Sequence, residues 1–225
     1  MFGAIIFLPE YQQIVRNDSA TRSGLLLTPL VFGLLAGSIF SGRIISKLGH
    51  YRPFPIIGTA LVTLGFFLFS HLTIRTSQFI LTIWMLILGV GIGLFMQVMT
   101  LAVQNSVDRK DLGTATSVVI FFRTIGSSLG AAIFGAILTS RLTYHLQQTV
   151  PGAKSLHLTA SNLSAAPKVL RALPPTIHQG ILEAFARSFH DVFLFGIPFA
   201  LAAFLVSLLL REAPLKTTTR CSTTE

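Results

Sequence analysis

LGTATSVVIFFRTIGSSLGAAIFGAILTSRL, residues 112–142, decides the fold class of this chain. A helix of about 20 apolar residues crosses the hydrocarbon core of a bilayer, and this stretch is long enough to do so with some tilt. Within its apolar body, Arg123 is the only charged residue. At 100° per residue, Arg123 shares a stripe with Thr116, Ser127 and Gly130, whereas large apolar side chains lie on the opposite side. The stretch predicts a membrane-spanning helix with one small, polar face.

Arg123 needs polar surroundings, because a charged side chain near the middle of a membrane helix costs about 2.5 to 3.5 kcal/mol. Such residues usually face a bundle interior or a water-filled path. We therefore expect Arg123 and Ser127 to point towards partner helices or a substrate route. The alternative is that the arginine side chain lies along the helix and places its guanidinium near the lipid headgroups.

The composition excludes an ordinary soluble domain. Of the 225 residues, 52% are hydrophobic and 11% are charged, and the mean hydropathy is +0.71, whereas soluble domains carry charge on about a quarter of their residues. The net charge of +9 comes from basic residues in short polar segments without a nucleic-acid recognition motif. We expect a multi-pass protein of the plasma or inner membrane, partnered by the lipid bilayer and not by nucleic acid.

The sequence does not predict catalysis or metal binding. It contains no paired carboxylates, histidine cluster or nucleophile beside a base, and its six histidines are dispersed. We therefore predict no catalytic residues, no metal site and no cofactor. The lone cysteine, Cys221, excludes an intramolecular disulfide.

Hydropathy predicts an all-α integral membrane protein, with a six-helix transmembrane bundle over residues 1–211. The expected spans are about 1–15, 23–46, 53–72, 79–103, 113–141 and 192–210. The first apolar run is short and contains Pro9, so we expect Met1 to fall within a truncated helix. Pro29 predicts a kink in the second span.

A long polar loop is expected between the last two spans, from Thr143 to His190 on the outer side, and a cytoplasmic tail over residues 212–225. Within the loop, apolar residues recur every four positions from Ile177 to Phe189. This spacing predicts an amphipathic helix that lies on the membrane surface or leads into the last span.

Glycines at four-residue spacing predict close helix packing. Gly33 begins one GxxxG face, Gly126 begins another, and residues 89–93 place three glycines inside an apolar helix. Gly58 has fewer such neighbours. We therefore expect Gly33→Leu and Gly126→Leu to impair assembly more than Gly58→Leu.

Other polar residues within apolar runs are candidates for the lining of a substrate pathway. Glu10, Tyr11 and Gln13 follow Pro9, and Glu10 is the only acidic residue that we place in a span. Gln97 and Gln104 lie seven residues apart on one helix face. The alternatives are an interfacial belt for the first group and interhelical hydrogen bonding for the two glutamines.

Charge gives a weak orientation signal. Six spans place eight basic residues on each side, but without the long loop the count becomes eight against three. The side with eight is expected to be cytoplasmic, together with the C-terminus.

Several stretches together resemble the major facilitator superfamily, specifically the C-terminal half of its fourteen-span drug:proton antiporter branch. They are FLPEYQQIV, SATRSGLLLTPLVFGLLAGSIFSGRIISKLGHYRPFPIIG, GVGIGLFMQVMTLAVQNSVDRKDLGTATS, FFRTIGSSLGAAIFGAIL and DVFLFGIPFALAAFLVSLLLREAPL. GSIFSGRIISKLGHYRP is similar to the second copy of the family's cytoplasmic gating motif. Its gating residues here would be Gly37, Gly42, Arg43, Lys47 and Gly49, without the usual acidic residue.

The resemblance implies a secondary transporter that exports drugs or other small organic molecules by alternating access, with protons as the coupling ion. It also implies a partner, the N-terminal half of the same transporter, which this chain lacks and which usually carries the acidic proton sites. We therefore expect that residues 1–225 do not transport alone. The alternative function is a membrane scaffold or assembly subunit, and water access to Arg123 would distinguish the two.

Overall fold

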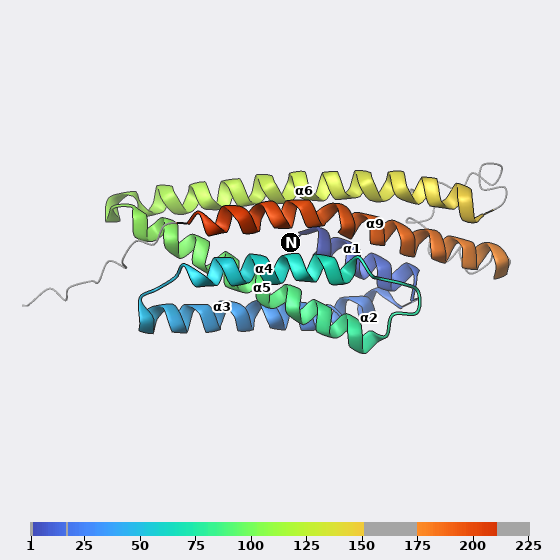
Figure 1. The fold of residues 1–225 in the computed structure, drawn as a ribbon, viewed down its shortest axis with the longest axis horizontal. Coiled ribbons are helices and arrows are strands. Elements are labelled where there is room, and N and C mark those ends of the chain that lie inside the picture. Colours follow the sequence, from blue (N-terminus) through green and yellow to red (C-terminus); the bar gives the residue numbers. More distant parts are fainter. Residues whose placement is uncertain (1, 17, 151–174, 211–225) are drawn as a thin grey trace, which may run out of the picture.

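The computed structural model describes residues 2–16, 18–150 and 175–210, and its regular elements are helices throughout these ranges. The long helices run roughly along one axis, with α5 crossing the others obliquely (Figure 1). Their bounds are α1 Phe2–Ile14, α2 Ala20–Leu25, α3 Thr28–Leu48, α4 Pro53–Phe69, α5 Gln78–Ser106, η1 Arg109–Asp111, α6 Leu112–Thr149 and α9 Pro175–Leu208.

Four stretches of these described helices are long and apolar enough to cross a membrane. They are residues 20–48, 78–106, 109–149 and 179–208. Helix α4 is apolar and carries no charge but has only 17 residues, and α1 has 13. The all-helical membrane class expected from the composition is confirmed, whereas the count of six spans stays a prediction.

Helix α5 is the centre of the bundle, because it packs extensively against both α3 and α4. Its glycines allow this approach: a Cβ atom on Gly89 would lie 2.2 Å from the Leu30 carbonyl oxygen of α3, and one on Gly91 would lie 2.8 Å from the Gly58 carbonyl oxygen of α4. On α3, Gly33 meets the Leu86 carbonyl oxygen in the same way. The predicted glycine seams at residues 33 and 89–93 are therefore confirmed.

Among the described residues, the contacts of Gly126 and Gly58 are the reverse of those expected. A Cβ atom on Gly126 would meet nothing within 4 Å among the described residues, whereas one on Gly58 would meet the α5 backbone. Gly58 packs because α5 offers a glycine opposite it, and this partner cannot be read from the sequence around Gly58.

Pro29 separates two helices instead of kinking one. Helix α2 ends at Leu25, and α3 begins at Thr28 with Pro29 in its first turn. Proline is tolerated there because the N–H groups of the first turn have no hydrogen-bond acceptor within the helix. The hydroxyl of Thr28 donates to the Leu25 carbonyl at 2.6 Å and closes the junction. At the other end of α3, Gly49 adopts φ 74°, the left-handed conformation that terminates helices.

The polar loop expected from Thr143 to His190 is helical at both ends. Helix α6 continues to Thr149, and α9 begins at Pro175; residues 151–174 lie outside the described part of the chain. The extension follows from packing, since Leu142 and Leu146 of α6 and the periodic residues of α9, Ile181, Phe185 and Phe189, are all buried. The expected amphipathic segment is thus the first part of α9, leading into the last span.

The turn between α4 and α5 is held by side chains from other helices. Tyr11 and Arg16, at and just beyond the end of α1, donate to the carbonyls of Thr73 and Thr76 at 2.8 and 3.0 Å. From α9, His190 Nδ1 contacts the Ser70 carbonyl. These contacts fix one end of the bundle.

Candidate functional site

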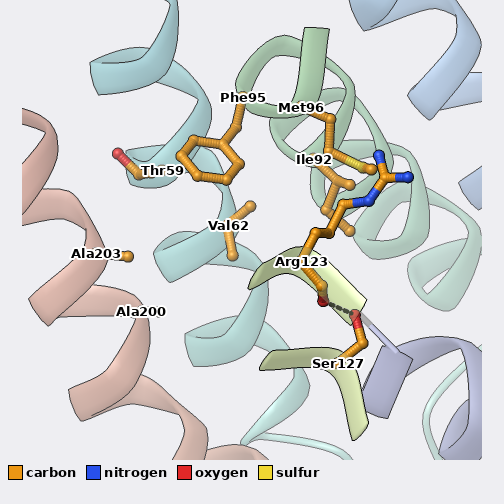
Figure 2. Close-up of a pocket in the computed structure, with 9 residues that line it drawn as sticks. All are labelled: Thr59, Val62, Ile92, Phe95, Met96, Arg123, Ser127, Ala200 and Ala203. Atoms are coloured by element: carbon orange, nitrogen blue, oxygen red, sulfur yellow. Dashed lines mark hydrogen bonds between the residues drawn. The ribbon is translucent and has the colours of Figure 1, made fainter. Parts of the chain in front are cut away.

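A cavity of about 190 Å³ lies between four helices around Arg123 (Figure 2). Helices α4, α5, α6 and α9 all contribute to it. Its lining consists of Thr59, Val62, Ile92, Phe95, Met96, Arg123, Ser127, Ala200 and Ala203. One charged group therefore faces a mostly apolar space.

The cavity forms where α6 diverges from the rest of the bundle. Helix α6 packs extensively against α9 but makes few contacts with α5. Alanines on α9, Ala200 and Ala203, leave space that larger residues would fill. On the opposite wall, the side chains of Phe95 and Met96 extend from α5 (Figure 2).

Arg123 extends from α6 towards Ile92 and Met96 of α5 (Figure 2). It is exposed, and its guanidinium has no hydrogen bond or ion pair with another described residue. Its backbone carbonyl accepts a hydrogen bond from the Ser127 hydroxyl at 2.6 Å, one helical turn away. The expected pairing of Arg123 with Ser127 on one polar stripe is present, and the stripe faces the cavity.

The two hydroxyl groups of the lining are already engaged. The Ser127 hydroxyl donates within α6, and the Thr59 hydroxyl donates to the Pro55 carbonyl at 2.7 Å. Thr59 also lies 3.0 Å from the Ser207 hydroxyl of α9, a contact that ties α4 to α9. Arg123 is therefore the principal free hydrogen-bond donor of the cavity.

The polar residues of α1 lie away from this cavity. Tyr11 is buried, packs edge-on against Phe189 and hydrogen-bonds the Thr73 carbonyl. Glu10 and Gln13 are half-buried. Gln12 was not a candidate, yet its side chain is completely buried and neither amide atom has a hydrogen-bond partner among the described residues.

The two glutamines of α5 also differ from the expected pathway. Gln104 donates to the Thr116 hydroxyl of α6 at 3.0 Å, which is the interhelical alternative. Gln97 is exposed and does not line the cavity. The seven-residue spacing correctly placed both on one side of α5 but could not show what each side chain meets.

The expected gating segment lies at the end of α3. Arg43 and Lys47 are exposed, Gly42 and Gly49 are half-buried, and Gly49 ends the helix. Gly37 belongs to the packing seam, where its Cβ position lies 2.6 Å from the Val90 carbonyl oxygen. The arrangement leaves the two basic groups free for partners outside the described chain.

Sequence reasoning missed an acidic residue within a helix. Asp191 had been placed just outside the last span, but α9 begins sixteen residues earlier and includes it. Its carboxylate lies 2.9 Å from His145 Nε2 and 3.7 Å from Arg141 Nε, both on α6. Helix α9 thus contains two acidic residues, Glu183 and Asp191, in addition to the Glu10 expected in the first span. Asp191 ties the second half of α6 to α9.

Sequence reasoning also missed most of the apolar cavity lining. Phe95, Met96 and the two alanines carry no signal that separates them from ordinary core residues. Only Thr59, a hydroxyl in an apolar run, offered such a signal.

An ionisable residue beside a cavity in a bundle of apolar helices is typical of a functional site in a membrane protein. Comparison with known proteins gives the family. The family model described as Major Facilitator Superfamily matches residues 1–131. The chain belongs to this superfamily, whose transporters are multi-pass proteins generally found in the plasma membrane.

Three relatives illustrate the similarity. An uncharacterized MFS-type transporter of Mycobacterium tuberculosis is 40% identical over 96% of this chain and 31% of its own length. Multidrug transporter protein MdtP of Bacillus subtilis is 36% identical over 82% of this chain and 34% of its own length. Multidrug resistance protein 3 of the same organism is 32% identical over 95% of this chain and 43% of its own length. The matched region thus spans between 31% and 43% of the length of these relatives.

Proposed function

We propose that this chain forms the C-terminal six-helix half of a fourteen-span secondary transporter, which exports small organic molecules, drugs among them, in exchange for protons. The observation that carries the proposal is the single charged side chain, Arg123, in a cavity between four apolar helices. A charge in this position is costly unless it serves a polar path or ligand. Membership of the superfamily indicates transport rather than catalysis.

The first half of α6 supports a further protein partner. From Leu112 to Ile137, no residue of α6 is buried within the described bundle. Its surface includes the small polar residues Ser117, Thr124 and Ser128, all exposed. Small residues favour close helix contacts over contact with lipid. In the proposal, the N-terminal half of the transporter covers this surface.

The scaffold alternative explains the glycine seams equally well but gives Arg123 no role. A scaffold requires packed helices, whereas this cavity reaches 190 Å³ around an exposed cation. The transporter proposal therefore accounts for one more feature of the chain. It keeps the C-terminus in the cytoplasm, as the charge balance predicts.

The test is water access to Arg123 during transport. We would introduce Arg123→Cys into the full native polypeptide, with Cys221 replaced by serine, and apply a membrane-impermeant thiol reagent from each side in proteoliposomes. We expect labelling from at least one side and loss of transport. Full activity without labelling under any condition would contradict the cavity assignment.

A second measurement addresses the proposed division into halves. Residues 1–225 alone and the full native polypeptide would be reconstituted in parallel under an imposed pH gradient. We expect saturable, gradient-dependent export only with the full polypeptide, because alternating access requires one half to move against the other. Saturable export by residues 1–225 alone would instead require a homodimeric transporter.

A further inference from the structure

We propose that the Arg123 cavity binds amphipathic organic anions, with a carboxylate or sulfonate on the guanidinium and one substituted benzene ring among the apolar side chains. This inference rests on the proposed transport function and names its substrate class. It separates the chain from a general binder of lipophilic cations.

The charge of the cavity lining favours an anionic ligand. Of the residues around the cavity, Arg123 is charged, Thr59 and Ser127 carry hydroxyls, and the others are apolar. None of the described residues that line the cavity carries a carboxylate. An organic cation would meet an unbalanced positive charge in an apolar space, where like charges repel strongly, whereas an anion would neutralise it.

The hydrogen-bonding groups of the cavity lining favour a ligand head that accepts hydrogen bonds. The guanidinium presents five N–H donors and no acceptor, and it makes no hydrogen bond to another described residue. The hydroxyls of Ser127 and Thr59 donate to backbone carbonyls. The free polar groups therefore suit a ligand head rich in acceptors, such as the two or three oxygens of a carboxylate or sulfonate.

The size of the cavity suits a ligand body of one aromatic ring. An apolar cavity of about 150 Å³ is enough to hold benzene, and this one measures about 190 Å³. The aromatic ring of Phe95 and the thioether of Met96 suit an aromatic ligand, since rings pack edge-on and sulfur contacts ring edges favourably. The ligand body is thus one ring with a short substituent.

The experiment compares two probes with the same apolar body and opposite charge, 4-tert-butylbenzoate and 4-tert-butylbenzylammonium. Binding of each radiolabelled probe to the full native polypeptide in nanodiscs would be measured by equilibrium dialysis. We expect the anion to bind at least about 10-fold more tightly than the cation, the effect of one charge-assisted hydrogen bond. Equal affinities, or tighter binding of the cation, would overturn the proposal.

Variants test whether Arg123 is the cause. Arg123→Met should weaken anion binding by at least about 10-fold, and Arg123→Lys should retain the preference for the anion with reduced affinity, because lysine lacks the planar fork. Ala200→Leu should weaken both probes by filling the cavity. Arg109→Met, in the exposed turn η1 outside the lining, is the matched control and should change neither.

A separate case is that Arg123→Met lowers binding only because the variant misfolds. In that case both probes would weaken together and Arg123→Lys would not rescue the preference, which would also overturn the proposal.

Transport separates this inference from the proposed function. If proteoliposomes export the cationic probe but not the anionic one, the transporter function stands and the substrate class is wrong. If Arg123-dependent anion binding is present but neither probe nor a panel of neutral and cationic drugs is exported, the binding site stands and the transporter function fails.

Discussion

Two regions of the molecule carry similar patterns of small residues but have opposite surroundings. One is the contact between α3 and α5, and the other is the first half of α6. In the first region, glycines at positions 33, 37, 89 and 93 bring two backbones into contact. In the second, Gly126 and Gly130 meet nothing within 4 Å, and Phe121 and Phe122 are 60% and 67% exposed. A glycine pattern therefore marks a surface fit for close packing, and only the fold shows whether a partner lies within this part of the chain.

The two regions also differ in polar content. The contact between α3 and α5 is almost entirely apolar, with the Ser38 hydroxyl donating to the Gly93 carbonyl at 3.2 Å. The first half of α6 carries Arg123 and several exposed hydroxyl groups. The packed region stabilises the bundle, and in our proposal the unpacked region is the part that receives the substrate and the N-terminal half.

The largest expected effect is at Gly89. In Gly89→Leu, the new Cβ atom would lie 2.2 Å from the Leu30 carbonyl oxygen, so α3 and α5 must separate. We expect a loss of stability of at least about 3 kcal/mol, the upper range for overpacking. The measurement uses a protein that consists of residues 1–225. It records the fraction of this protein that remains monodisperse in mild detergent as the sample is heated.

Gly126→Leu is the matched control for this change. It should leave residues 1–225 within about 0.5 kcal/mol of the parent, as for a surface substitution. In the full native polypeptide the same variant should reduce assembly, if the other half covers α6. Equal losses for both variants in residues 1–225 would remove the contrast between the two regions.

Gly58→Leu tests the glycine that the sequence undervalued. Its Cβ atom would lie 2.8 Å from the Gly91 carbonyl oxygen and 3.0 Å from the Phe95 amide nitrogen, both in α5. We expect a loss of about 1 to 3 kcal/mol, measured by the same heating assay. A Gly58→Leu variant as stable as Gly126→Leu would show that α4 can move away from α5 at little cost.

Asp191→Asn tests how the second half of α6 is held. The substitution preserves shape but removes the negative charge that lies beside His145 and Arg141. We expect a loss of about 1 to 2 kcal/mol, since hydrogen bonds to charged groups exceed neutral ones. Glu183→Gln is the control on the same helix, because its pair with Arg187 is exposed on one helical face. A larger effect at Glu183 would contradict the assigned role of Asp191.

The smallest expected effect is at Gln104. Its hydrogen bond to Thr116 is a direct polar link between α5 and the first half of α6. Gln104→Met should cost about 0.6 kcal/mol, the average for such bonds within membranes. A double-mutant cycle with Thr116→Val measures the coupling, and a coupling of zero would show that the two residues do not interact.

The sequence by itself determined the membrane class, the order of the apolar helices and the polar stripe of Arg123 and Ser127. These features depend on local properties, namely the length of each apolar run and the 100° turn per residue. Pro29 marked an irregularity in the second span in the same way, but the sequence predicted a kink where the structure has a junction between two helices.

Only the tertiary structure decided which surfaces meet. Gly58 is packed because α5 places Gly91 opposite it, and Gly126 is open because α6 diverges from α5. Asp191 lies within a long helix because the apolar side chains of α9 pack against α6. This packing extends both helices beyond the ends that hydropathy predicts, residues 141 and 192. The cavity lining joins four helices, from Thr59 on α4 to Ala203 on α9, so the surroundings of Arg123 depend on helix packing, which no local pattern encodes.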